Sequence, residues 1–159
     1  MEERRVVSKS LSLALTEGFR ELSEEEKGKL RYVGPGNARI FRDEQNHILL
    51  SFAWKKIPLF SAFILSNQDL AEQTEKTVSK AMREFGYACE GFVTHTLQRR
   101  EAKGFRFGYV VQDTAMRGES LLCKKKSGIC YLHAYWRQES AEKAEEIWKN
   151  VLESARWEG

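Results

Sequence analysis

Large apolar residues alternate with polar or small ones along much of the second half of the chain. From Phe105 to Val111 every second side chain is large and apolar, and this period of two predicts a strand with one buried face. We expect it to open a group of three strands within residues 104–137, joined by turns at Met116–Gly118 and Lys125–Gly128. Connections this short leave no room for crossover helices, so neighbouring strands must pair antiparallel. The pattern therefore excludes a doubly wound nucleotide-binding sheet in this half.

Four earlier segments also carry strand-like patterns. They are Lys9–Thr16, Ala38–Arg42, Ile48–Lys56 and Phe92–Arg100. The polar run Asp43–His47 predicts a hairpin loop, and Glu101–Gly104 predicts the turn after the last of these strands. The apolar run Leu59–Leu65 leaves two interpretations open, a strand or a buried loop.

Helical spacing appears in three places. The segments are a short helix opened by Ser23–Glu26, a long helix over Asp69–Phe85 begun by Asn67 or Asp69, and a final helix from Ser140. Ser23 and Glu26 have the spacing of a capping box, and Gly34–Gly36 should break the short helix. Gly86 is suited to end the long helix, and Trp148 lies on the apolar stripe of the last. We therefore expect an α+β fold, with an antiparallel sheet of about six or seven strands flanked by helices.

Length and composition fit one domain over residues 1–159. The chain has 159 residues, ordinary apolar content and a net charge of +3, which is too small to indicate nucleic acid. We expect no signal peptide, because Leu11, Leu13 and Leu15 alternate with serine and alanine near the N-terminus, and no membrane span. The oligomeric state stays open.

Three cysteines, Cys89, Cys123 and Cys130, form an odd set that favours a reducing compartment, with the cytoplasm as the expected location. The loop Lys125–Gly128 should place Cys123 and Cys130 opposite each other across a hairpin. A disulfide on oxidation is one reading. Two buried thiols that pack as small hydrophobic groups are the favoured one.

The order of elements resembles the PsbP-like superfamily, an α/β/α sandwich. The segments that carry the resemblance are Gly118–Lys124, Ile129–Tyr135 and Ile147–Arg156. That superfamily includes the PsbP subunit of photosystem II, a nuclear-import factor that binds the GTPase Ran, and bacterial domains of unknown function. The resemblance implies a protein-interaction role, or that of a cytoplasmic chaperone for secreted effectors. It transfers no functional residue by position.

The candidates for catalysis are cysteines paired with histidines. Cys130 and His133 are three residues apart on one strand and so face opposite ways, while Cys89 and His95 are far apart along an extended segment. Zinc-binding and phosphate-loop motifs are absent from the sequence. We expect a non-enzyme without cofactor or metal; a cysteine-dependent hydrolase or redox enzyme is the alternative.

Nucleic-acid binding is a second alternative. Lys103–Val110 partly matches the aromatic strand of RNA-recognition motifs, although alternating rings more commonly mark a buried face. Basic residues at two turns could share one end of the sheet, namely Arg99, Arg100, Lys103, Arg106, Lys124, Lys125 and Lys126. Solvated turn lysines that protect sheet edges are the favoured interpretation.

The last predicted strand suggests a site for a protein partner. One of its faces carries Cys130, Leu132, Ala134 and Trp136, and the other carries Tyr131, His133, Tyr135 and Arg137. The second set joins aromatic rings to polar groups, a composition typical of binding hot spots. We expect it to bind a partner whose identity the sequence does not reveal. Whether the long helix covers this face stays open.

Overall fold

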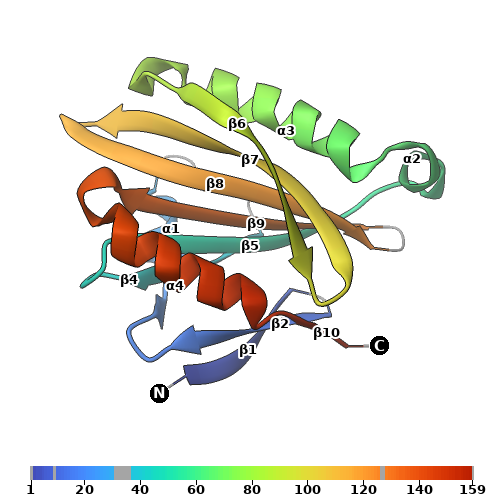
Figure 1. Cartoon of the computed structure of the whole chain (residues 1–159), viewed down its shortest axis with the longest axis horizontal. Helices are drawn as coiled ribbons and strands as arrows, with labels where there is room; N and C mark the ends of the chain where they lie inside the picture. Colours follow the sequence, from blue (N-terminus) through green and yellow to red (C-terminus); the bar gives the residue numbers. More distant parts are fainter. Residues whose placement is uncertain (1, 9, 31–36, 126–127, 159) are drawn as a thin grey trace.

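The largest element of the computed structural model, which describes residues 2–8, 10–30, 37–125 and 128–158, is a seven-stranded antiparallel sheet (Figure 1). In order across the sheet its strands are β3 (Arg20–Glu21), β4 (Arg39–Asp43), β5 (Ile48–Lys56), β9 (Gly128–Arg137), β8 (Thr114–Lys125), β7 (Arg100–Val111) and β6 (Ala88–Leu97). The predicted α+β class and strand number are confirmed. All neighbouring strands of this sheet pair antiparallel, as the short connections required.

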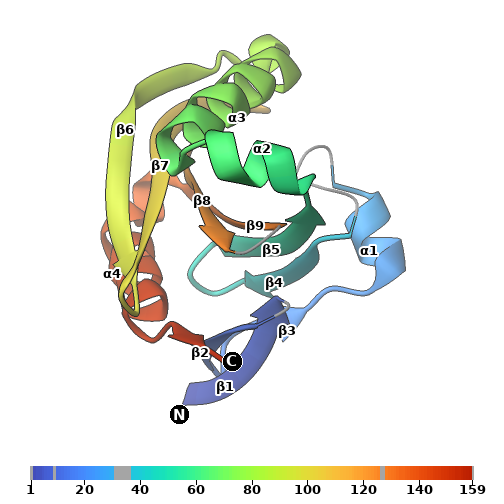
Figure 2. The same cartoon turned by 90° about the vertical axis from the view of Figure 1, so that its right-hand side faces the viewer.

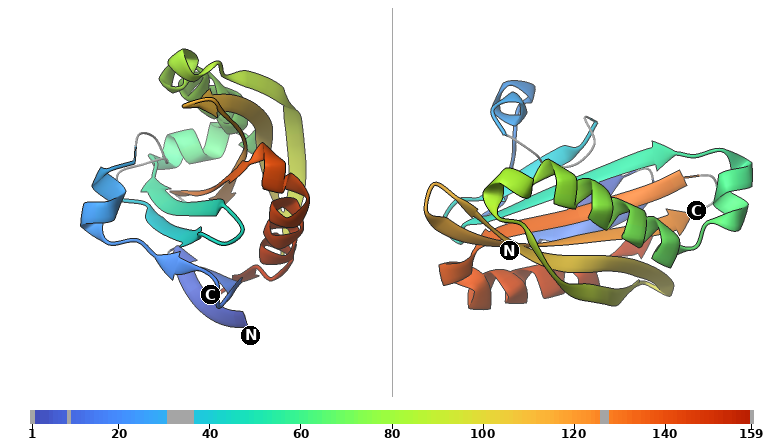
Figure 3. Two further views of the ribbon diagram at one scale, coloured as in Figure 1. Left: turned by 90° about the vertical axis from the view of Figure 1, so that its left-hand side faces the viewer. Right: turned by 90° about the horizontal axis from the view of Figure 1, so that it is seen from above.

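The remaining elements cover the two faces of this sheet (Figures 2 and 3). One face is covered by α4 (Ala141–Glu153) and by a small sheet made of β1 (Glu2–Ser8), β2 (Leu11–Thr16) and β10 (Arg156–Trp157). Over the other face lie α3 (Asn67–Ala81), the short helix α2 (Leu59–Ile64) and the 3-10 turn η1 (Arg83–Phe85). A short helix α1 (Glu24–Gly28) lies beside β4, and the 3-10 turn η2 (Gln138–Ser140) leads into α4. We name these two surfaces the α4 face and the α3 face.

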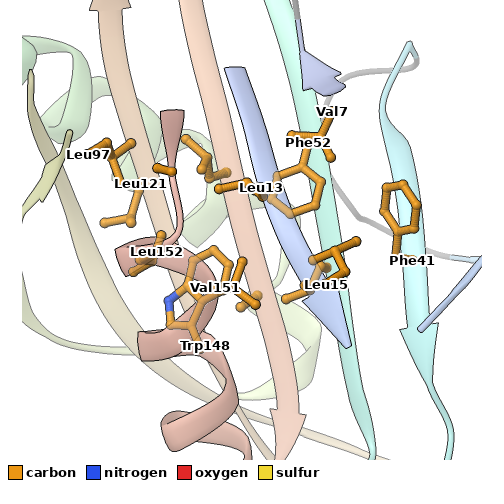
Figure 4. Packing of buried hydrophobic residues seen from close by; sticks show 14 of the residues in the cluster. Val7, Leu13, Leu15, Phe41, Phe52, Leu97, Leu121, Trp148, Val151 and Leu152 are labelled. Carbon is orange, nitrogen blue, oxygen red and sulfur yellow. The ribbon is translucent and has the colours of Figure 1, made fainter. Parts of the chain in front are cut away.

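The larger core lies on the α4 face (Figure 4). Trp148, Val151 and Leu152 of α4 pack among apolar side chains of β2 and the large sheet, including Leu13 and Leu121. Trp148 is only 2% exposed, which confirms that the predicted apolar stripe of the last helix is its buried side. This core accounts for most of the large buried side chains.

A smaller aromatic core lies on the α3 face. Phe105, Phe107 and Tyr109 of β7 pack with Tyr135 of β9 beneath Val78 and Met82 at the C-terminal part of α3. Their alternation in the sequence therefore marks a buried face, as favoured.

Two predicted turns are wrong, because both segments lie inside long strands. Glu101–Gly104 belongs to β7 and Met116–Gly118 to β8; the chain reverses instead at Gln98–Arg99 and Gln112–Asp113, where non-glycine residues adopt positive φ. Gly118 serves close packing rather than a turn. A Cβ at that position would lie 2.5 Å from the ring of Phe107.

The helix ends lie close to the positions predicted from the sequence. Ser23 and Glu26 form the predicted capping box of α1. In the long helix Ser66, rather than Asn67 or Asp69, is the N-cap, and Gly86 ends the following turn with φ of 69°. The predicted break at Gly34–Gly36 falls outside the described residues.

The N-terminal residues and the apolar run 59–65 differ from expectation. Residues 2–8 form β1, an additional strand that pairs with β2. The run Leu59–Leu65 is neither a strand nor a buried loop: most of it is α2, which has no buried residue. Its apolar character therefore reflects something other than core packing.

The predicted cross-strand cysteine pair is confirmed. Cys123 lies opposite Cys130 in the β8–β9 register, and both side chains are buried. Within this hairpin turn, Lys126 and Ser127 lie outside the described residues.

Candidate functional site

A groove of about 640 Å³ opens on the α3 face. Strands β9, β8, β7 and β5 supply its floor, and the end of α3 with η1 forms one wall. Lys29 and Leu30, which directly follow α1, and the β4–β5 turn form the opposite side. The size is that of an ordinary ligand or side-chain pocket.

The groove exists because α3 covers only part of its face. The helix packs over β7 and β8, and Gly86 then turns the chain back into β6 before it reaches β9 and β5. The left-handed conformation at this glycine carries no steric cost, so η1, the turn that follows α3, ends here. Strands β9 and β5 in the middle of the sheet are consequently left without a helix above them at this end.

The floor of the groove is apolar. Tyr109 and Tyr135 are 8% and 5% exposed, and Leu49 and Met116 lie half-buried beside them. Tyr135 meets Phe107 edge to face, with ring centroids 6.2 Å apart. Burial raises the pKa of Tyr109, so its hydroxyl stays protonated and the floor carries no charge there at neutral pH.

The rim of the groove is mainly cationic. Lys29, Arg42 and Arg137 line it, and Arg42 makes no ion pair within the described part of the chain. Arg137 lies 3.5 Å from Glu139, a pair whose two side chains are both exposed. Two acidic residues also line the groove: Asp43 is buried and accepts hydrogen bonds from Asn46, and Glu44 is exposed. An acidic ligand would thus meet more positive than negative charge at the opening.

The four residues proposed for partner binding are divided by the structure. Tyr135 and Arg137 line the groove, whereas Tyr131 and His133 lie further along β9 and do not. Tyr131 is half-buried against two smaller apolar clusters. The alternation itself is as predicted, because Leu132, the residue between them, packs in the core of the α4 face.

His133 is part of the interior rather than a surface contact. It is 2% exposed, lies 2.7 Å from the hydroxyl of Ser120, and stacks between Tyr131 and Tyr135. Burial lowers the pKa of His133 to about 4, so the ring is neutral at pH 7.

Several groove residues had no signal in the sequence. Arg42 stands in a short strand, Met116 in an expected turn, and Met82 among other apolar residues of a helix. They meet only because β9 pairs with both β5 and β8, which brings segments distant in sequence together. A period-two pattern identifies a face but not the part of it that remains uncovered.

The cysteines and histidines do not form the proposed catalytic pairs. Cys123 and Cys130 belong to the core of the α4 face, and His133 points to the α3 face. Burial raises the pKa of Cys123 to about 11, which opposes formation of a nucleophilic thiolate. Cys89 is exposed on β6, whereas His95 lies against Glu119.

Glu119 is the centre of a buried polar cluster beneath α4. It is fully buried and accepts hydrogen bonds from Arg106 Nε at 2.6 Å and Trp148 Nε1 at 3.0 Å, with His95 Nε2 at 2.8 Å. Burial alone would raise the pKa of Glu119, but the hydrogen bonds from His95 and Arg106 outweigh it and lower the pKa. Arg106 also pairs with Glu145. This arrangement fixes α4 to the sheet and leaves Arg106 engaged inside the fold.

Two of the basic residues at the turns contact an aromatic ring. Arg100 and Lys125 approach the ring of Trp157 at 5.7 Å and 4.9 Å from its centroid. Both turns therefore share one end of the sheet, as their spacing allowed. Lys125 is 4% exposed and Lys103 donates to Thr94, so these charges contribute to packing at the end of the sheet.

Within the part of the chain that is described, no group of three or more His, Cys, Asp or Glu side chains is placed to hold a metal ion. Among the same residues, no helix is long and apolar enough to cross a bilayer.

Comparison with known proteins shows the fold of this chain. Neither protein-family models nor curated protein sequences give a match. Solved structures do: the cyanobacterial PsbP of Synechocystis sp. PCC 6803 is similar with a TM-score of 0.72 and 13% identity, over 99% of this chain and 92% of that one. The chain therefore has the PsbP-like fold, as the order of its elements suggested.

Two further structures share this fold. Mog1, solved as a point mutant, is similar with a TM-score of 0.57 and 9% identity, over 99% of this chain and 96% of that chain. LpqN of Mycobacterium tuberculosis, described as involved in cell envelope biogenesis, is similar with a TM-score of 0.57 and 10% identity, over 98% and 89% of the two chains. Identities this low establish the architecture alone.

Proposed function

We propose that this protein is a non-enzymatic interaction module whose groove on the α3 face binds an acidic peptide segment of a partner protein through one of its apolar side chains. The observation that carries the proposal is the groove itself, in which an apolar floor of Tyr109, Tyr135 and Met116 lies beneath a cationic rim. An apolar side chain inserted into such a floor would lose contact with water, and carboxylates beside it would face the rim.

The charge of the rim supports an acidic partner. Arg42 is half-buried and lacks an ion pair with any described residue, so a carboxylate from a ligand would find a guanidinium already positioned. The ion pair of Arg137 with Glu139 is long and exposed, so Arg137 could exchange Glu139 for a carboxylate of the ligand at little cost in free energy. Tyr135 and Arg137 are thus the retained members of the partner site proposed from the sequence, while Tyr131 and His133 support it from within the sheet.

A non-enzymatic role fits the state of the nucleophiles and bases. The pKa of Cys123 is raised, His133 is neutral and buried, and His95 is held against Glu119. We also infer a reducing compartment such as the cytoplasm, because the odd set of Cys89, Cys123 and Cys130 suits one better than a disulfide scaffold does. These features disfavour a cysteine-dependent enzyme, and the packing of Arg100 and Lys125 against Trp157 disfavours a nucleic-acid binder.

A peptide selection tests the groove directly. A library of displayed random peptides would be selected on the whole chain, and the affinities of enriched peptides measured by fluorescence anisotropy. We expect enriched peptides to combine an apolar residue with neighbouring Asp or Glu. Val111→Trp, which fills the groove, should reduce their affinity by about tenfold or more.

Matched variants separate the groove from the rest of the surface. Val110→Trp alters the neighbouring residue, which faces the other way and is 48% exposed, and should leave the affinity unchanged. Arg42→Glu should weaken binding about fivefold, whereas Arg83→Glu on η1, outside the groove, should not. Enriched peptides that bind the Val111→Trp and Val110→Trp variants equally well would contradict the proposal. So would a selection that enriches nothing.

A further inference from the structure

Helix α2 carries the most exposed of the large apolar side chains in the described part of the chain. Leu59 is 77% exposed, Phe60 74%, Phe63 88% and Ile64 55%. The helix lies at one end of the molecule, beyond the central part of the sheet (Figures 1 and 3). A contiguous apolar surface of this kind on a folded protein marks an interaction site.

The orientation of α2 is the reverse of an ordinary surface helix. The small residues Ser61 and Ala62 are the less exposed ones, and the large apolar residues point away from the protein. A helix that stabilised this fold through its side chains would bury Phe60 and Phe63. Their exposure therefore adds nothing to folding.

The ends of α2 are fixed by other contacts. Lys124 donates to the carbonyl oxygens of Ala62 at 2.6 Å and Leu65 at 2.5 Å, which satisfies the C-terminal end of the helix. Ile57 and Leu65, on either side of α2, pack against the small apolar cluster between α3 and the sheet. The helix is thus held in place through its backbone and its flanks, and its apolar side chains stay outside.

Further polar contacts fix the corner between α2 and α3. The side chain of Asn67 donates to the carbonyl of Glu101 and accepts from the backbone N–H of Lys124, at 2.9 Å in each case. Ser66 and Asp69 cap the start of α3 reciprocally. These contacts support a defined apolar tip rather than a loose loop.

Positive charge adjoins the tip. Lys55 and Lys56 are both exposed at the end of β5, directly before the turn into α2, and neither pairs with a described carboxylate. The first acidic residue after the helix, Asp69, is engaged with Ser66. Phenylalanine and leucine beside lysine is the composition of protein segments that insert into the interface of an anionic bilayer.

We infer that α2 is a membrane-docking tip, which inserts Leu59, Phe60 and Phe63 into the surface of a bilayer rich in anionic lipids while Lys55 and Lys56 contact the headgroups. A fluid bilayer accommodates a convex apolar tip without needing a complementary pocket, and anionic headgroups match the lysines. The contact is peripheral and does not depend on the groove. It would place the groove at a membrane surface.

A second copy of the chain fits this tip less well. In a symmetric dimer through α2 the same surface of each copy would meet, so Lys55 and Lys56 would approach their own counterparts. Like charges brought together beside an apolar contact oppose association, whereas an anionic surface attracts them. The charge around the tip therefore favours lipid.

Vesicle co-sedimentation of the whole chain tests the inference. We expect binding to vesicles of equimolar phosphatidylcholine and phosphatidylglycerol, and much weaker binding to phosphatidylcholine alone. The double variant Phe60→Ser and Phe63→Ser should lower the partition coefficient by about tenfold or more, since two apolar side chains no longer insert. Its thermal unfolding should match that of the unaltered chain, because both residues are exposed.

Control variants distinguish insertion from general attraction. Lys55→Gln with Lys56→Gln should reduce binding to the anionic vesicles by roughly 30-fold and leave binding to zwitterionic vesicles unchanged. Val110→Ser, which removes an exposed apolar side chain elsewhere, should have no effect, and neither should Val111→Trp in the groove.

Three outcomes would overturn the inference. They are failure of the unaltered chain to sediment with anionic vesicles, undiminished binding of the double phenylalanine variant, and a dimer in solution that this variant dissociates while vesicles bind neither form. The last outcome would identify a second copy as the occupant of the tip.

Discussion

The two faces of the large sheet are built from the same alternating strands but reach different states. On the α4 face, α4 and β2 cover the sheet, and Trp136, Trp148 and Leu121 are all 2% exposed or less. On the α3 face, α3 covers mainly β7 and β8, and the groove remains over the rest. The difference shows that a face with buried residues need not be a closed core.

The buried polar groups of the two faces differ as well. On the α4 face Glu119 is ionised and held by donors from three elements, β7, β6 and α4. On the α3 face His133 is neutral, with Ser120 as its hydrogen-bond partner. The first links layers together, and the second lies within the sheet. Each arrangement predicts a different response to mutation and pH.

The largest effect is expected from Trp148→Ala on the α4 face. Loss of this ring, which is 2% exposed, should lower the free energy of unfolding by about 3–5 kcal/mol because a large cavity forms. Chemical denaturation measures it. Trp148→Phe keeps most of the ring but removes the donor to Glu119, and it should lower the free energy of unfolding by less. A loss below about 1 kcal/mol for the alanine variant would show that this face is not the main core.

Tyr135→Ala tests the floor of the groove. An open face would have left stability nearly unaltered by this change, but the 5% exposure of Tyr135 and its contact with Phe107 predict a loss of about 2–3 kcal/mol. We expect less than for Trp148, because the groove next to Tyr135 admits solvent. If urea denaturation showed equal losses of unfolding free energy for Tyr135→Ala and Trp148→Ala, the two faces would not differ in how well they are closed.

The pH dependence of stability should report His133. Its pKa is about 4 in the folded protein and about 6.5 when unfolded, so the unfolded chain binds more protons between these values. The contribution is complete above pH 6.5 and is lost as pH falls toward 4, with a loss of about 2 kcal/mol between pH 7 and pH 5.

A His133→Asn variant provides the control for this titration. Urea denaturation at pH 7 and pH 5 should show a smaller difference for the variant than for the unaltered chain, since His47 and His95 remain in both. Identical pH dependence in the two proteins would mean that His133 is accessible to water and that this part of the α3 face is open.

The smallest effect on stability is expected from Arg137→Ala at the rim. Its ion pair with Glu139 is exposed and 3.5 Å long, so the change in unfolding free energy should stay below about 0.5 kcal/mol. The affinity for acidic peptides should nevertheless fall. A thermal shift as large as that of Tyr135→Ala would place Arg137 in the core and remove it from the site.

Much of the architecture could be predicted because it depends on local patterns. Alternation assigned Leu132 and Tyr131 to opposite faces, helical spacing identified α4, and hairpin length placed Cys123 opposite Cys130. The positions of turns were less accessible. Gln112–Asp113 turns without glycine, whereas Gly118 lies in a strand to make room for Phe107.

The sequence by itself determined which side chains share a face, since the periods of strands and helices are fixed by the backbone. It also supplied the apolar run that became α2 and the lysines before it. Only the tertiary structure decided which surfaces stayed open. That β9 lies beyond the end of α3 depends on the pairing of β9 with β5 and β8, and that α2 is held with its phenylalanines outward depends on contacts of Lys124 with residues about 60 positions away. A local pattern carries no signal for either.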